Sequence, residues 1–71
     1  MIKVNIKQNV IKNFLAKKNK SQNWFAMKLG ISSGYMSKLL LGDRHPSPKI
    51  REKILEILNE LKFDDIFRIE K

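Results

Sequence analysis

Two short segments with helical apolar spacing, joined at a glycine, constrain this chain more than any other feature. Residues 21–41 read SQNWFAMKLGISSGYMSKLLL, and apolar residues recur at three- and four-residue intervals on both sides of Gly30. Glycine takes positive φ without a Cβ clash, so it can end one helix and reverse the chain. Ser21 and Ser32 each stand where a hydroxyl can accept from the free N–H groups that open a helix. The segment therefore predicts two short helices joined by a tight turn.

The second of these helices is predicted to have an apolar inner face and a small, polar, basic outer face. The inner face consists of Met36, Leu39 and Leu40, and it would pack on Phe25, Ala26 and Leu29 of the first helix. The outer face consists of Ser33, Gly34, Ser37, Lys38 and Leu41. Such a surface can enter the major groove of DNA and present hydroxyl and ammonium groups to base edges. We therefore predict base contacts from Ser33, Gly34, Ser37 and Lys38, with Lys38 the sharpest discriminator because it can donate to guanine O6 or N7.

Charge is distributed unevenly along the chain. Residues 1–42 contain eight lysines and no acidic residue, whereas residues 43–71 contain seven basic and seven acidic residues. The net charge of +8 therefore belongs to the half that holds the predicted helix pair. Neutralisation of phosphates by basic side chains is typical of nucleic-acid binding. A basic amphipathic helix can also bind anionic lipid, but here the apolar stripe of the first helix is needed for the core.

Residues 22–39 resemble the helix-turn-helix of the phage repressor and Cro-like family, often called the XRE family. Counting Gln22 as the first residue, Ala26 is fifth, Gly30 ninth, Ile31 tenth, Met36 fifteenth and Leu39 eighteenth. The resemblance covers about residues 7–61, because a glycine, a basic loop and a proline follow within residues 42–48. It implies an all-α, lambda-repressor-like bundle of four to five short helices. It also implies a sequence-specific transcriptional regulator of phage, plasmid or mobile-element type that binds double-stranded DNA as a homodimer on a palindromic site.

The resemblance implies roles for individual residues outside the reading face. Gln22 resembles the family's phosphate-anchoring glutamine, at the positive end of a helix. Arg44 lies in the loop after the reading helix, where its forked guanidinium suits a phosphate. The other predicted phosphate contacts are Ser32, Tyr35, Lys17 and Lys20.

Two positions depart from the family pattern. Relatives often carry an acidic residue at the position of Leu40, paired with an arginine at the position of Leu15, so an apolar contact is expected to replace an ion pair here. Gly34 stands where relatives often carry a base-reading side chain. The alternative for Gly34 is a weak point in the helix that costs about 1 kcal/mol against alanine.

The rest of the chain is predicted to complete one domain over residues 1–71. Asn5 and Gln8 resemble a capping box for a helix over about residues 6–18, with Val10, Ile11, Phe14 and Leu15 on its apolar face. Ser47 and Pro48 favour the start of a helix over about residues 48–61, followed by a tail over residues 62–71. Residues 1–6 and 66–70 alternate as short strands do. These ends could pair as an antiparallel β-ribbon, or the C-terminal segment could pack on a partner subunit.

Composition argues against several other functions. The chain has no cysteine for a disulfide or thiolate zinc site, and His45 is its only histidine, so we expect no metal or cofactor. Asp64 and Asp65 are adjacent and project differently, and no oxyanion motif is present, so we expect no enzyme and no small-molecule substrate. No apolar run approaches the roughly 20 residues that cross a bilayer, and no secretory signal is present. We therefore expect a cytoplasmic, nucleoid-associated protein of a bacterium or phage.

The rival interpretation is a protein-interaction module, such as an antirepressor or assembly factor. It would keep the same fold but bind a protein through Trp24, Tyr35 and the C-terminal segment. Glutamate at positions 37 and 38 should abolish DNA binding and leave such a partner bound. RNA binding is a weaker hypothesis than either of these, because proteins that recognise single-stranded RNA use exposed aromatic platforms.

Overall fold

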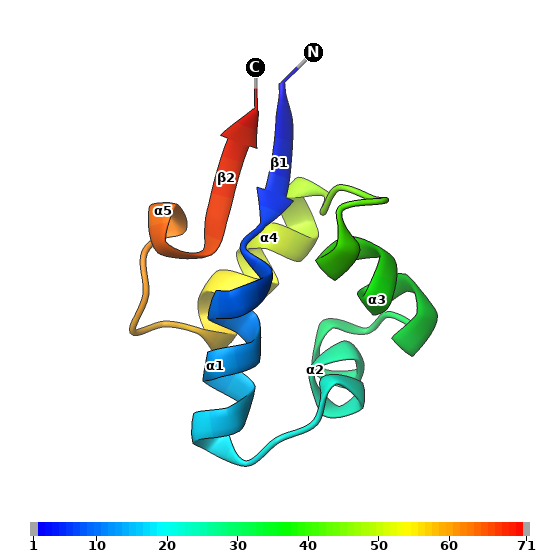
Figure 1. Ribbon diagram of the computed structural model, residues 1–71, viewed down its shortest axis with the longest axis vertical. Helices are drawn as coiled ribbons and strands as arrows, with labels where there is room; N and C mark the ends of the chain where they lie inside the picture. Colours follow the sequence, from blue (N-terminus) through cyan, green and yellow to red (C-terminus); the bar gives the residue numbers. More distant parts are fainter. Residues whose placement is uncertain (1, 71) are drawn as a thin grey trace.

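The computed structural model describes residues 2–70 and shows short helices around one core, with a two-stranded ribbon that brings the two ends of the chain together (Figure 1). In chain order the elements are β1 (Lys3–Ile6), α1 (Gln8–Lys18), α2 (Gln22–Leu29), α3 (Ser33–Leu41), α4 (Pro48–Ile57), α5 (Phe63–Ile66) and β2 (Phe67–Glu70). The predicted helical bundle and the terminal ribbon are both confirmed.

Serine side chains begin α2, α3 and α4, as the sequence predicts. The Oγ atoms of Ser21, Ser32 and Ser47 accept from the backbone N–H groups of Trp24, Tyr35 and Ile50 at 3.0, 3.1 and 3.2 Å. Pro48 follows in the first turn of α4, where its missing N–H costs no helical hydrogen bond. Three helix starts are thus fixed by local hydrogen bonds that do not depend on the rest of the fold.

Glycine ends both helices of the turned pair. Gly30 has φ of 74°, and the N–H of Ile31 donates to the carbonyl of Ala26 at 3.0 Å. Gly42 ends α3 with φ of 87°. Both residues adopt the left-handed conformation in which a Cβ is strained. The positive φ predicted for Gly30 is therefore confirmed, and the reversal sets α2 against α3.

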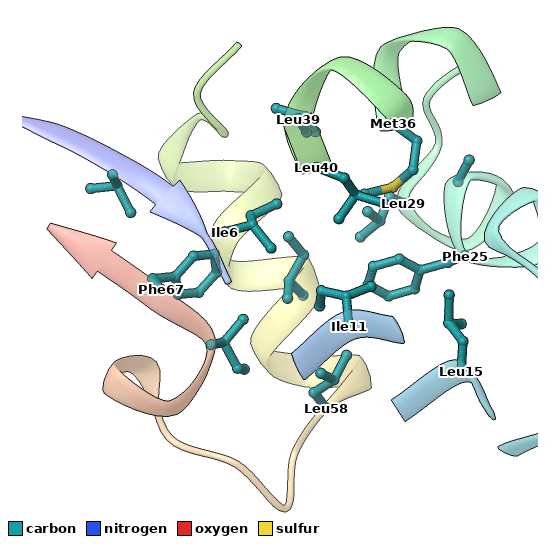
Figure 2. Close-up of a cluster of buried hydrophobic side chains, with 14 residues drawn as sticks. Ile6, Ile11, Leu15, Phe25, Leu29, Met36, Leu39, Leu40, Leu58 and Phe67 are labelled. Carbon is teal, nitrogen blue, oxygen red and sulfur yellow. The ribbon is translucent and has the colours of Figure 1, made fainter. Parts of the chain in front are cut away.

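The core is a single cluster of buried apolar side chains (Figure 2). Its members are Val4, Ile6, Ile11, Leu15, Phe25, Ala26, Leu29, Met36, Leu39, Leu40, Ile54, Leu58, Ile66 and Phe67. The predicted inner faces of α2 and α3 are therefore buried as expected. Leu15 and Leu40, the positions of the family's ion pair, both belong to this apolar cluster.

At the N-terminus, the structure has a β-strand where the sequence predicted the capping box of the first helix. β1 pairs antiparallel with β2, so Asn5 lies opposite Arg68 and Ile6 lies opposite Phe67. Because Asn5 and Ile6 are held in a strand, α1 begins at Gln8. Its N-cap is Lys7, which makes no side-chain capping bond. The capping box of Asn5 and Gln8 is therefore wrong, and the helix starts two residues later than residue 6.

The C-terminal helix is also shorter than the predicted span of residues 48–61. The α4 helix ends at Ile57, because Leu58 turns out of the helical conformation with φ of −97° and ψ of 52°. Leu58 is nevertheless buried in the core. The helical spacing of apolar residues in the sequence therefore continues past the end of the helix itself. The predicted tail contains the short helix α5, in which the Asp65 carboxylate accepts from the N–H of Lys62 at 2.9 Å.

Candidate nucleic-acid interface

The predicted reading face lies on the outside of α3, at one edge of the molecule (Figure 1). The helix buries Met36, Leu39 and Leu40, and this leaves the opposite side toward solvent. On that side Ser33, Gly34 and Lys38 are exposed and Ser37 is half-buried. Leu41, the remaining residue of the predicted outer face, is 69% exposed. The structure thus places the four predicted base-contacting residues along one solvent-facing stretch of α3.

A hydrogen bond joins this face to the start of α2. The Nε2 of Gln22 donates to the Oγ of Ser37 at 3.0 Å, across fifteen residues of sequence. Gln22 is the first residue of α2, where free backbone N–H groups and the helix dipole favour an anion. The side chain predicted to anchor phosphate therefore lies beside a residue predicted to contact bases. Sequence spacing alone did not reveal this bond, because it depends on how α2 crosses α3.

The other predicted phosphate contacts surround the helix pair. Lys17, Lys20 and Arg44 are exposed. Ser32 is exposed and caps α3, so its Oγ is already an acceptor for the N–H of Tyr35. Tyr35 is half-buried and packs against the core. The loop that carries Arg44 is fixed to α3, because the backbone N–H of Arg44 donates to the carbonyl of Lys38 at 3.3 Å. Arg44 therefore follows the reading face at a defined place.

Two lysines flank Trp24, and sequence reasoning singled out only one of them. The Nζ atoms of Lys20 and Lys28 lie 5.4 and 5.7 Å from the centroid of the Trp24 ring. Cations within about 6 Å of an aromatic centroid are attracted to its face. Lys28 lies four residues after Trp24 on α2, and this spacing was the available signal. The indole of Trp24 thus lies near two ammonium groups, one from the loop before α2 and one from α2 itself.

Features of other functional classes are missing from the part of the chain that the structure describes. Among residues 2–70, no three His, Cys, Asp or Glu side chains gather where they could hold a metal ion. In the same range, no helix is both long enough and apolar enough to span a membrane.

Comparison with known proteins gives matches that include the residues of this interface. A family model described as helix-turn-helix matches residues 11–66, which includes α2, α3 and the loop after them. The chain is 31% identical over 65 residues to a Bacillus subtilis (strain 168) protein named an uncharacterized HTH-type transcriptional regulator, YvzC, and the match covers 92% of this chain and 83% of that protein. No solved structure matches the chain.

Proposed function

This chain belongs to the XRE-type helix-turn-helix family of DNA-binding regulators, and from that premise we propose that it is a sequence-specific transcriptional regulator that reads the major groove with α3. It would be a regulator of the phage, plasmid or mobile-element type that the resemblance implies, and it would bind double-stranded DNA in the bacterial cytoplasm. The relative from Bacillus subtilis, by its printed name also a transcriptional regulator, supports the regulatory role.

The observation that carries the proposal is the outer face of α3. It is exposed at an edge of the molecule, where a duplex can reach it without displacing another element (Figure 1). It carries small residues and one lysine, and the first acidic residue in the chain is Asp43, beyond the end of the helix. An α-helix fits the major groove, and small residues on its outer face permit close approach to base edges.

The residues of this face have different proposed roles. Lys38 is exposed and would donate to guanine, so it should contribute most to discrimination. Ser33 can donate or accept and would discriminate less. Ser37 already accepts from Gln22, so it would present its own hydroxyl hydrogen to a base while Gln22 reaches toward the backbone. Gly34 would contribute close backbone approach rather than a side-chain contact.

Phosphate contacts would fix the register of α3 in the groove. Gln22 would act with the free N–H groups at the start of α2, and Arg44 would contact the backbone beyond the end of α3. Lys17 and Lys20 would contribute charge on the side of α2, and Ser32 and Tyr35 would donate hydroxyl groups. If a homodimer on a palindromic site neutralised about ten phosphates, log Kd would change with log salt concentration with a slope of about 9.

Lys38→Gln tests the proposal most simply, and Lys62→Gln is its matched control. Both lysines are exposed, and both substitutions remove one charge. Lys62 precedes α5, which lies across the molecule from α3 in Figure 1. The assay is titration of a labelled cognate duplex, selected from a random pool, at two salt concentrations. Lys38→Gln should weaken specific binding by about 5- to 160-fold for each half-site, as expected for a lost base contact of roughly 1–3 kcal/mol. Lys62→Gln should bind like the parent chain.

Equal effects of the two substitutions would contradict a reading role for α3 and leave only general electrostatic attraction.

The structure also bears on the rival interpretation as a protein-interaction module. Trp24 and Tyr35 are half-buried and pack against the core, so much of each ring is already occupied within the chain. This favours DNA over a protein as the ligand of the helix pair.

A further inference from the structure

We propose that Leu41 determines specificity at one base pair of each half-site, through an apolar contact with the 5-methyl group of a thymine. This role rests on the proposed function, because it names the base that one further position of the reading face selects. The side chain is free to take it, since Leu41 belongs neither to the core nor to the half-buried side chains that pack against the core.

Leu41 is a large apolar side chain that the fold leaves in solvent. Among residues 2–70, the large apolar side chains that are exposed are Ile2, Met27, Leu41 and Ile69. Only Leu41 of this group is part of α3. The two leucines before it are buried, with Leu39 1% and Leu40 6% exposed. Successive residues of a helix point about 100° apart, so the third leucine of the run projects away from the core.

Helix geometry places Leu41 in line with the residues proposed to meet DNA. It lies three residues after Lys38 and four after Ser37, the spacings that make neighbours on one helix face. It lies seven residues after Gly34, so the two positions project within about 20° of each other. A single exposed leucine is common on a protein surface, but this one occupies the middle of the proposed reading face. A duplex whose groove follows α3 therefore covers Gly34 and Leu41 together.

Hydrogen bonds at the end of α3 fix the last turn of the helix, and with it the position of Leu41. The N–H of Gly42 donates to the carbonyl of Leu39 at 3.3 Å, and the N–H of Asp43 donates to the carbonyl of Lys38 at 3.0 Å. Helix ends without such bonds fray, and a side chain there has no single position. Because the last turn is already ordered, Leu41 loses less conformational entropy when it meets DNA.

The major groove offers a leucine one apolar partner. Base pairs present hydrogen-bond donors and acceptors there, and the one apolar group among them is the 5-methyl group of thymine. A leucine placed against the amino group of cytosine or the O6 of guanine would remove water from that group without a hydrogen bond in return. Leu41 therefore selects thymine in two ways, through burial of the methyl group and through the cost of the alternatives.

The position of Leu41 on α3 also predicts where the thymine lies. An α-helix rises about 1.5 Å per residue, so Leu41 lies about 4.5 Å beyond Lys38 along the helix axis. Successive base pairs are about 3.4 Å apart. For a helix that follows the groove, the thymine is expected one or two base pairs from the guanine proposed to bind Lys38. The base position at which Lys38→Gln loses its preference identifies that guanine by experiment.

The test replaces the thymines of the selected duplex with deoxyuridine, one position of the half-site at a time. Deoxyuridine lacks only the 5-methyl group and keeps the same base pairing. For the parent chain, substitution at the predicted position should raise the Kd about fourfold for each half-site, as expected when one buried methyl group is lost. Leu41→Ala should bind the thymidine and deoxyuridine duplexes equally, because the side chain that contacts the methyl group is gone.

Met27→Ala is the matched control for Leu41→Ala. It also removes an exposed apolar side chain, 74% exposed against 69% for Leu41, but from α2. This variant should keep the parent's fourfold preference for thymine, whatever its overall affinity. Circular dichroism and thermal unfolding should show that both variants fold like the parent chain, because substitutions of exposed side chains change stability little.

Three results would overturn the role of Leu41. They are a parent chain that binds every deoxyuridine duplex as tightly as the thymidine duplex, a half-site with no thymine at the predicted distance, and a Leu41→Ala variant that keeps the preference for thymine. The last result, with weaker binding overall, would place the leucine on the sugar–phosphate backbone instead. All three leave the proposed function intact, because the parent chain still selects a motif. A parent chain that selects no motif refutes the proposed function, and the role of Leu41 with it.

Discussion

Replacement of Gly34 by alanine separates the stability of α3 from its proposed contact with DNA. Gly34 lies in the first turn of α3, and a Cβ there would meet no atom within 4 Å. Alanine is favoured over glycine inside a helix by about 0.5–1 kcal/mol, because glycine loses more backbone entropy. For a chain of this size 1 kcal/mol corresponds to roughly 4–8 °C in Tm. We therefore expect Gly34→Ala to raise the Tm by about 2–8 °C.

The same methyl group should weaken binding to DNA. It projects from the outer face of α3, where the proposed docking brings the helix backbone close to base edges. A Kd about tenfold higher, equivalent to roughly 1.4 kcal/mol, is expected for the selected duplex at fixed salt. The two assays are thermal unfolding followed by circular dichroism and titration of the labelled duplex by fluorescence anisotropy. A more stable protein with weaker binding is a combination that general damage to the fold does not produce.

Two results would refute this reasoning. A lower Tm would show that the space around Gly34 is not open, and unchanged or tighter binding by a stabilised variant would show that Gly34 does not lie at the contact. Gly42→Ala is the control for glycine removal. Its Cβ also meets no atom within 4 Å, but its φ of 87° is strained for alanine. This variant should lower the free energy of unfolding by about 1–2 kcal/mol.

Further predictions follow from the other contacts. Ser47→Ala removes the cap of α4 and should lower the free energy of unfolding by about 1 kcal/mol in urea denaturation; no loss would show that the cap bond is not formed in solution. Gln22→Ala and Ser37→Ala, singly and together, should show a coupling of about 0.5–1.5 kcal/mol in unfolding, and strictly additive effects would exclude their hydrogen bond. Lys28→Gln should change the emission of Trp24, the only tryptophan, because it removes one of the two cations near the ring; an identical spectrum would contradict that geometry.

Features set by neighbouring residues were predictable from the sequence. Ser21, Ser32 and Ser47 cap helices through bonds to residues three positions later, and Gly30 reverses the chain through its own backbone freedom. The buried faces of α2 and α3 followed from helical periodicity for the same reason. These signals require no knowledge of the rest of the fold.

Features set by residues that are distant in the sequence were not predictable in this way. Asn5 and Gln8 had the spacing of a capping box, but pairing with Arg68 across the ribbon held Asn5 in a strand instead. Leu58 kept helical apolar spacing although the backbone had left the helix, because a turn can also deliver a side chain to the core. The bond between Gln22 and Ser37 depends on the crossing of two helices, which periodicity does not specify.

The pairing of β2 is a feature for which sequence and structure were both needed. The alternation of residues 66–70 predicted a strand but left its partner open. The structure pairs it with β1 within the same chain.

Selection from a pool of randomised duplex DNA, carried out in parallel with the parent chain and with Lys38→Gln, tests the central claim that α3 reads the major groove. The account predicts that the parent chain enriches a palindromic motif, and that the variant loses its preference at one base position in each half-site while it keeps the others. Recovery of the same motif by both proteins, or of no motif by the parent chain, would contradict it.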